Sequence, residues 1–225
     1  TELKYELYSE ILKNNTILLE NDSDGLIYDS NDNYYYFNGN VENNYIVVNN
    51  ELWRIVAINN DRSIKIIKNY GISNNKLYTF NNDYTNFKYQ GSNVMNELLL
   101  WYDNNFINSD KYVVESEYCV LYQSNICLEK KYYKVGLLNI DEVMRAGGSI
   151  TNNESYYLYN YYDWWIINND YDEFINSAYS GFVNSLGSID KGFVDEAKTI
   201  RPVINLKKDT YINGNRVADN NWSEC

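Results

Sequence analysis

The hydrophobic and polar positions of residues 34–68 follow the pattern of short β-strands joined by turns. The apolar runs of this block lie at 34–37, 44–48, 52–58 and 63–68. Asn38-Gly39, Asn49-Asn50 and Asn59-Asn60-Asp61 separate the runs, and Asn-Gly in particular favours a tight hairpin turn. The block is therefore predicted to form an antiparallel meander.

Two later segments show the period of an α-helix. Residues 92–105 carry apolar side chains on one helical face. A shorter helix is predicted at 140–145, with Asn139 or Asp141 as its N-cap and Gly147-Gly148 as its terminator.

Residues 1–20 also have apolar positions at helical spacing, which predicts an amphipathic N-terminal helix. Two interpretations of this helix stay open. In the first, it packs on its own domain. In the second, it is the remnant of a longer anchor helix, because the chain begins at Thr1 and an upstream segment is expected to have been removed. In that case the protein would contact a membrane only through the removed helix.

Apolar clusters in the C-terminal half alternate with polar connections that contain glycine. The run 164–167 is predicted to be a central strand, and 200–206, with its single proline near the start, the last strong strand. Between them, 181–183 and 192–194 are typical of hairpin strands.

Two segments lack a clear period. Residues 21–33 are rich in Asn, Asp and Ser, which predicts a loop, and 107–133 are predicted to be irregular. Strand clusters at both ends with helices between them indicate an α+β fold of mostly antiparallel strands with two or three helices. Residues 21–225 are expected to form a single domain after the N-terminal helix.

Charge and composition exclude several classes of function. The net charge is −12, which repels phosphate backbones and makes nucleic acid an unfavourable partner. The chain has no histidine, which excludes Ser-His-Asp, Cys-His and HExxH chemistry. It contains 25 tyrosines, a residue type that binding surfaces of antibodies use. We therefore expect no cofactor and no catalysis.

Cysteine spacing leaves two readings open. Cys119 and Cys127 are close enough in sequence to bridge one short loop, and such a disulfide would require an oxidising compartment. The alternative is a pair of free, partly buried thiols. Cys225, the last residue, is expected to be unpaired.

Three sequence blocks occur here together. They are 35–67, 135–147 and the stretch from Trp164-Trp165 to Ile200-Arg201-Pro202-Val203-Ile204-Asn205-Leu206. This combination resembles a family of unknown function that is common in surface and phage-related proteins of low-GC Gram-positive bacteria. The middle of the family's C-terminal pattern is similar to 180–189 here, and the resemblance covers most of residues 34–210.

The resemblance implies a C-type-lectin-like fold, which formylglycine-generating enzymes and the variable proteins of diversity-generating retroelements share. In those proteins the last third of the chain builds the ligand-binding face. The enzyme's cysteine pair has no counterpart here, because no cysteine lies between Cys127 and Cys225. The Trp-Asn-Asp signature of calcium-dependent lectins is also absent, and Trp164-Trp165 is followed by Ile166-Ile167 where the family has Leu-Arg-Ser.

Polar and aromatic residues of the C-terminal loops are the best candidates for a binding surface, because loops on a rigid scaffold tend to carry binding function. The predicted ligand-binding residues are Tyr162, Asp163, Asn168, Asn169, Asp170, Tyr171, Asp172, Tyr179 and Ser180. Asp170, Asp172 and Glu173 have the oxygen ligands that Ca²⁺ prefers, but their spacing differs from an EF-hand and a solvated acidic loop is the simpler reading. No metal site is therefore expected.

These features favour an extracellular or cell-surface recognition domain. We expect it to bind a protein or a glycan on another surface through its C-terminal loops, with a retroelement variable protein as a special case. One alternative is a structural pilin-like subunit anchored through residues 1–20. A second is a histidine-free hydrolase that uses two of the 31 acidic residues.

Overall fold

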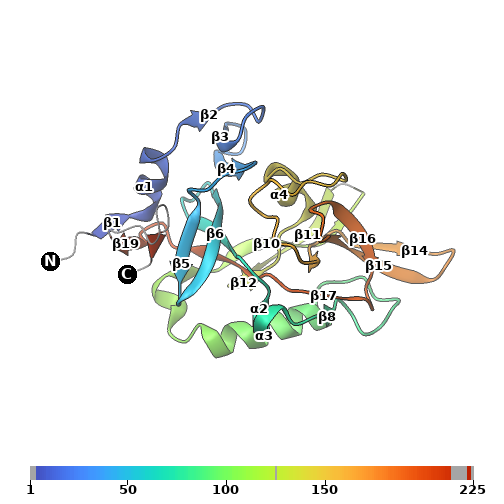
Figure 1. Cartoon of the computed structure of the whole chain (residues 1–225). Helices are drawn as coiled ribbons and strands as arrows, with labels where there is room; N and C mark the ends of the chain where they lie inside the picture. Colours follow the sequence, from blue (N-terminus) through green and yellow to red (C-terminus); the bar gives the residue numbers. More distant parts are fainter. Residues whose placement is uncertain (1–3, 125, 214–221, 224–225) are drawn as a thin grey trace.

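The computed structural model describes residues 4–124, 126–213 and 222–223 (Figure 1). It has an α+β architecture in which strands dominate and nearly all strand pairs are antiparallel. The helices are α1 (Leu7–Lys13), α2 (Ile72–Asn75), α3 (Asn93–Asn105) and α4 (Ile140–Arg145), with a 3₁₀ turn at Ser109–Lys111. None of the helices in these ranges is long and apolar enough to cross a membrane.

The largest sheet has ten strands. Its main path runs through β12 (Val135–Gly136), β18 (Val203–Leu206), β7 (Ile64–Lys68), β6 (Glu51–Ile58), β4 (Tyr34–Asn38), β3 (Gly25–Asp29) and β2 (Ile17–Leu18). Outside this path lie β5 (Tyr45–Val48), β9 (Val113–Val114) and β20 (Trp222–Ser223). Among the strands of this sheet that the structure describes, β2 with β3 and β5 with β20 are the pairs that run in parallel.

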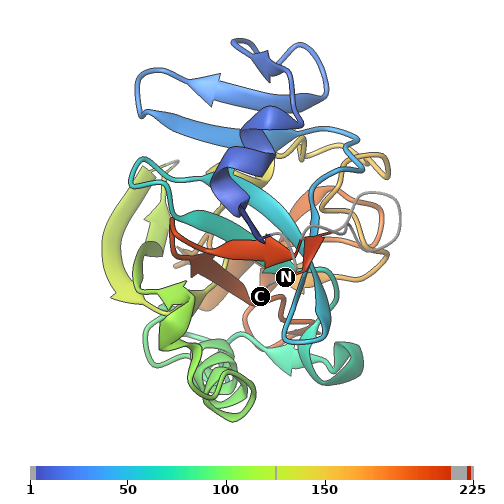
Figure 2. The same cartoon turned by 90° about the vertical axis from the view of Figure 1, so that its left-hand side faces the viewer.

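A second sheet is built from β13 (Trp164–Trp165), β14 (Asp170–Asp172), β15 (Ser177–Val183) and β16 (Ile189–Phe193). The remaining strands form three two-stranded pairs. These are β1 (Lys4–Glu6) with β19 (Tyr211–Asn213), β8 (Tyr78–Thr79) with β17 (Ala197–Lys198), and β10 (Ser116–Gln123) with β11 (Ile126–Tyr133). In Figure 1, β14 and β15 project at the side of the molecule opposite β1 and β19, which face the viewer in Figure 2.

The predicted meander is confirmed for β5, β6 and β7, which pair in sequence order. The predicted hairpin at Asn38-Gly39 is wrong, because β4 pairs with β3 and β6 and not with β5. Gly39, with a φ of 82°, turns the chain towards α4 instead. Its N–H donates to the carbonyl of Ala146, and its carbonyl accepts from the N–H of Tyr157. The loop predicted at 21–33 is also wrong, since it contains β3.

Both predicted internal helices are confirmed. The hydroxyl of Ser92 accepts a hydrogen bond from the N–H of Met95 and caps α3. Asn139 and Glu142 form a capping box at the start of α4, with both reciprocal hydrogen bonds present. Helix α2 was not predicted. It is a single turn in which Ser73 and Asn74 have left-handed backbone angles.

The N-terminal helix is shorter than the predicted 1–20. It begins at Leu7 and ends at Lys13, with β1 before it and β2 after it. Leu7 and Ile11 are fully buried in the main core, so this helix packs on the domain that follows it. Leu3 lies outside the described residues.

Residues 107–133, predicted to be irregular, contain the long hairpin of β10 and β11. The side chains of β11 are mostly exposed or half-buried on both faces, so no apolar period marks the strand. A disulfide joins Cys119 to Cys127 across the hairpin, with their Cα atoms 5.9 Å apart. The bridge fixes one strand against the other close to the turn.

Removal of this disulfide is expected to destabilise the protein by about 2–3 kcal/mol, because the bridge restricts a short loop in the unfolded chain. The test is denaturant unfolding of the Cys119→Ala/Cys127→Ala variant beside the native protein with and without a reducing agent. The variant should unfold at the lower denaturant concentration of the reduced native protein. If the variant and the reduced native protein both unfold at the same denaturant concentration as the oxidised native protein, the disulfide does not stabilise the fold.

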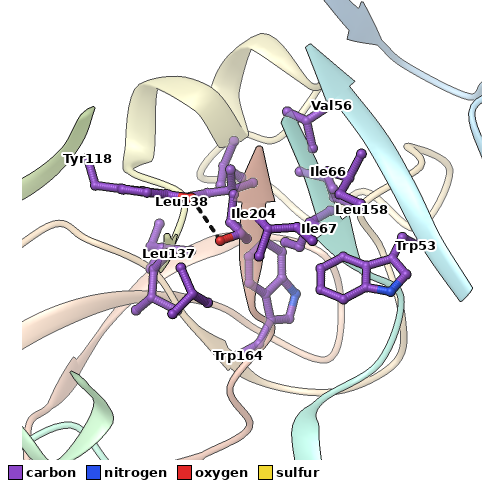
Figure 3. Close-up of a cluster of buried hydrophobic side chains, with 14 of the residues drawn as sticks. Trp53, Val56, Ile66, Ile67, Tyr118, Leu137, Leu138, Leu158, Trp164 and Ile204 are labelled. Atoms are coloured by element: carbon purple, nitrogen blue, oxygen red, sulfur yellow. Dashed lines mark hydrogen bonds between the residues drawn. The ribbon is translucent and has the colours of Figure 1, made fainter. Parts of the chain in front are cut away.

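The C-terminal apolar runs lie in the interior, as expected. Trp164-Trp165-Ile166-Ile167 is buried throughout, although only its first two residues are a strand and β15 takes the central place in that sheet. Strand β18 lies between β7 on one side and β9 and β12 on the other, so it is an interior strand that begins just after Pro202. Figure 3 shows Ile204 of β18 among Ile66, Ile67 and Trp164.

Candidate binding surface

The open face of β14, β15 and β16 brings several of the predicted binding residues together. Asp170 of β14 and Phe193 of β16 both pair with Tyr179 of β15, and directly paired residues point to the same face of a sheet. The rings of Tyr179 and Phe193 are stacked with centroids 4.6 Å apart. Lys191 reaches across from β16, and its Nζ lies 2.6 Å from Oδ2 of Asp170.

A surface recess of about 500 Å³ lies over this face. It is lined by Asp170, Tyr171, Asp172, Glu173, Phe174, Tyr179 and Lys191. The hydrogen bond from Lys191 lowers the pKa of Asp170, so this carboxylate is ionised at neutral pH. Partial burial raises the pKa of Tyr179, and the carboxylates of Asp172 and Asp170 raise it further. The recess therefore offers an aromatic surface with acidic groups at its edge.

The turn between β14 and β15 exposes two large apolar side chains. Phe174 is fully exposed, at 101% of its reference area, and Ile175 is 54% exposed. The turn itself is held in shape: Oδ1 of Asp172 accepts from the N–H of Phe174 at 2.8 Å, and the hydroxyl of Tyr171 donates to Asn176. Phe174 is thus an exposed ring on an ordered turn.

Two of the predicted binding residues are structural instead. Asn169 is buried, and its amide donates to the carbonyl of Phe87 at 2.6 Å. Ser180 is fully buried, and its hydroxyl donates to the carbonyl of Ile166 at 2.9 Å. Their polar groups satisfy backbone atoms within the fold, so neither reaches a ligand on the surface. Asn168 is half-buried, next to Gly181.

Tyr162 and Asp163 lie at the other end of the second sheet. Oδ1 of Asp163 accepts from the N–H of Ser185, which follows the C-terminal end of β15, whereas Asp170 pairs near its N-terminal end. Tyr162 is exposed and contacts the ring of Tyr70 edge-on. These two residues therefore belong to a different part of the surface from the recess.

The acidic residues of this hairpin do not gather as metal ligands. Among the described residues, no group of three or more Cys, Asp or Glu side chains is placed to hold a metal ion. The carboxylate of Asp170 is engaged by Lys191 and that of Asp172 by the backbone of the turn.

Comparisons with known proteins give no relative. No family model, no curated protein and no solved structure matches the chain.

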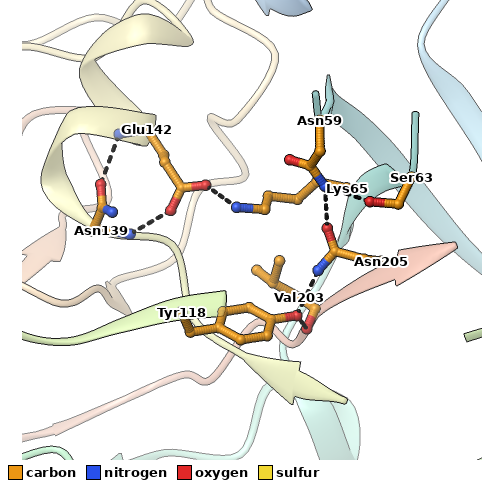
Figure 4. Close-up of polar contacts among 8 residues, drawn as sticks. All are labelled: Asn59, Ser63, Lys65, Tyr118, Asn139, Glu142, Val203 and Asn205. Atoms are coloured by element: carbon orange, nitrogen blue, oxygen red, sulfur yellow. Dashed lines mark hydrogen bonds and ion pairs between the residues drawn. The ribbon is translucent and has the colours of Figure 1, made fainter. Parts of the chain in front are cut away.

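A second polar cluster, which sequence reasoning missed, lies on one face of the large sheet, between the sheet, α4 and β10 (Figure 4). Nζ of Lys65 on β7 lies 2.5 Å from Oε2 of Glu142 on α4. Beside it, the amide of Asn59 donates to Asn205 on β18 at 2.8 Å, and Asn205 donates to the hydroxyl of Tyr118 at 2.9 Å. The only sequence signal is a polar residue within each of two apolar strands, at Lys65 and Asn205.

Proposed function

We propose that this protein is a non-catalytic recognition domain that acts outside the cell and binds a protein partner through the β14–β15 hairpin. The observation that carries the proposal is the exposed Phe174 on an ordered turn, next to Ile175. A fully exposed phenylalanine is unfavourable in water, whereas rigid aromatic side chains are typical anchors of protein interfaces. A protein therefore suits this tip better than a glycan does.

Other features support the same proposal. The recess beside the tip supplies acidic and aromatic groups that suit the polar rim of an interface. A C-type-lectin-like fold is part of the proposal; it is supported by the α+β architecture and by the sequence blocks that resemble that class. The disulfide between Cys119 and Cys127 supports an oxidising environment such as the cell exterior.

The test compares the native domain with a Phe174→Ala/Ile175→Ala variant on an array of extracellular proteins and glycans. For any protein that the native domain binds, the variant should lose at least about tenfold in affinity, since anchor residues commonly contribute more than about 2 kcal/mol. Ile107→Ala, at a side chain that is 75% exposed elsewhere, is the matched control and should bind like the native domain. Equal binding by the hairpin variant, or binding to glycans alone, would refute the proposal.

A further inference from the structure

A polar cavity of about 520 Å³ lies on one face of the large sheet, away from the β14–β15 hairpin. Along this face Tyr36, Ala57, Lys65 and Asn205 are paired in turn across β4, β6, β7 and β18, so their side chains point the same way. The hairpin of β10 and β11 and the C-terminal end of α4 supply the other walls. The cavity therefore lies over interior strands of the sheet, a position that apolar side chains normally cover.

The floor of this cavity is polar and fixed in place (Figure 4). Lys65, Ser63 and Asn205 are 8%, 3% and 0% exposed. The amide nitrogen of Asn59 donates to both Ser63 and Asn205, while its Oδ1 accepts no hydrogen bond from the described residues. Lys65 uses one of its three donors on Glu142. The floor thus offers two free donors on Lys65 and one free acceptor on Asn59.

The charges that line the cavity exclude an anionic ligand. Each cation of the lining already has a carboxylate close by. The pairs are Lys65 with Glu142 at 2.5 Å, Lys130 with Glu117 at 3.4 Å, and Arg145 with Asp32 at 3.5 Å. Asp61 and Glu115 add further negative charge. A phosphate or carboxylate would find no uncompensated positive charge here, and would be repelled by the surplus carboxylates.

Two tyrosine rings complete the lining. Tyr34 lies on the sheet side, and Tyr132, which is 67% exposed, lies on the rim formed by β11. A tyrosine ring at this position can pack against the C–H groups of a ligand, while the neighbouring amides and carboxylates form hydrogen bonds with the ligand's polar groups. Hydroxyl groups suit such a site because each can donate and accept at once.

We propose that this cavity binds a small neutral saccharide. A volume of about 520 Å³ lies within the range of small-molecule sites and accommodates a mono- or disaccharide. The free donors of Lys65 and the free Oδ1 of Asn59 match a polyhydroxylated ligand, and the surplus carboxylates, which disfavour an anion, can accept hydrogen bonds from its hydroxyl groups. The site is separate from the hairpin proposed to bind a protein, and it does not depend on that proposal.

The first experiment records amide chemical shifts of the native domain with a panel of probes. The saccharide probes are glucose, galactose, mannose, N-acetylglucosamine, lactose and cellobiose, and the ionic probes are the phosphate anion and zwitterionic glycine. At least one saccharide should shift signals from Asn59, Ser116 and Tyr132, while phosphate and glycine should leave them unchanged. No shift with any saccharide, or shifts there with phosphate or glycine alone, would overturn the proposal.

Variants test whether the saccharide binds in the cavity. Asn60→Ala/Tyr132→Ala changes two exposed lining residues outside the core and should weaken binding of the responding saccharide at least tenfold. Tyr84→Ala, at a tyrosine that is 52% exposed elsewhere, should bind it unchanged, and so should the hairpin variant at Phe174 and Ile175. Undiminished binding by the Asn60→Ala/Tyr132→Ala variant would overturn the assignment. Loss of binding in the hairpin variant alone would place the saccharide on the other surface.

Discussion

Above pH 10 the protein is expected to unfold cooperatively, because several of its buried tyrosines keep their protons only in the folded state. Tyr89, Tyr118, Tyr156 and Tyr157 are at most 5% exposed, and burial raises the pKa of each above the ordinary value of 10. Because the pKa of each tyrosine is raised in the folded state, its contribution to the stability of the native state is fully present below pH 10. That stability is lost as the pH rises, since the unfolded tyrosines ionise first.

The expected slope is steep. Each of the four tyrosines removes up to about 1.4 kcal/mol per pH unit above pH 10. Arg201 acts in the opposite direction, because burial lowers its pKa to about 9 and the folded state then gains stability between pH 9 and its ordinary range. A net loss of about 4 kcal/mol per pH unit remains. For a stability of about 5–15 kcal/mol, the midpoint falls between about pH 11 and 14.

Tyrosinate absorbance and far-ultraviolet circular dichroism, recorded together against pH, test this expectation. Exposed tyrosines should ionise without loss of structure, and the buried ones should ionise in a single step that coincides with unfolding. Tyr157→Phe should raise the alkaline midpoint, whereas Tyr132→Phe, at an exposed ring, should leave it unchanged. Complete ionisation near pH 10 in a protein that stays folded would contradict the expectation.

The buried ion pair between Lys65 and Glu142 predicts the second large effect. Loss of one partner leaves the other charge buried and uncompensated, which costs about 3–5 kcal/mol. Glu142→Gln is the sharpest single change, because glutamine keeps the capping box of α4 while it removes the charge. This variant should lose about 3 kcal/mol or more of unfolding free energy in urea.

The double variant Lys65→Met/Glu142→Gln removes both charges and should recover most of that loss, since a buried ion pair is seldom more stable than neutral groups of similar size. A double-mutant cycle from urea unfolding of Lys65→Met, Glu142→Gln and the double variant gives the coupling between the two residues. Additive effects, or a Glu142→Gln variant within about 1 kcal/mol of the native protein, would show that the pair is effectively solvated.

Local sequence signals were sufficient where an element carries its own caps and apolar period. The apolar period of 92–105 predicted α3, and Asn139, one of two candidate N-caps, is the residue that caps α4, because these signals lie within the helix or its first turn. Strand β3 and the hairpin of β10 and β11 were missed because neither is marked by an apolar period. The structure places β3 beside β4, and a disulfide joins β10 to β11.

The binding residues were harder to predict, for a physical reason. Asn169 and Ser180 look like surface residues in sequence, yet each satisfies a buried backbone carbonyl. Phe174 looks like a core residue, yet it is fully exposed. Lys65 gains its partner from a residue 77 positions away, so its burial depends on tertiary structure alone. Polarity predicts exposure only when no such distant partner exists.

The pairing of β1 with β19, and of β20 with β5, has a consequence for how the domain can be presented. Both pairs lie at the pole of the molecule opposite β14 and β15 (Figures 1 and 2). A tether joined at either end of the chain would therefore hold the domain with Phe174 directed away from the support. Immobilisation on a sensor surface through either end should leave the hairpin accessible, and the two orientations should be equivalent for a ligand that binds there.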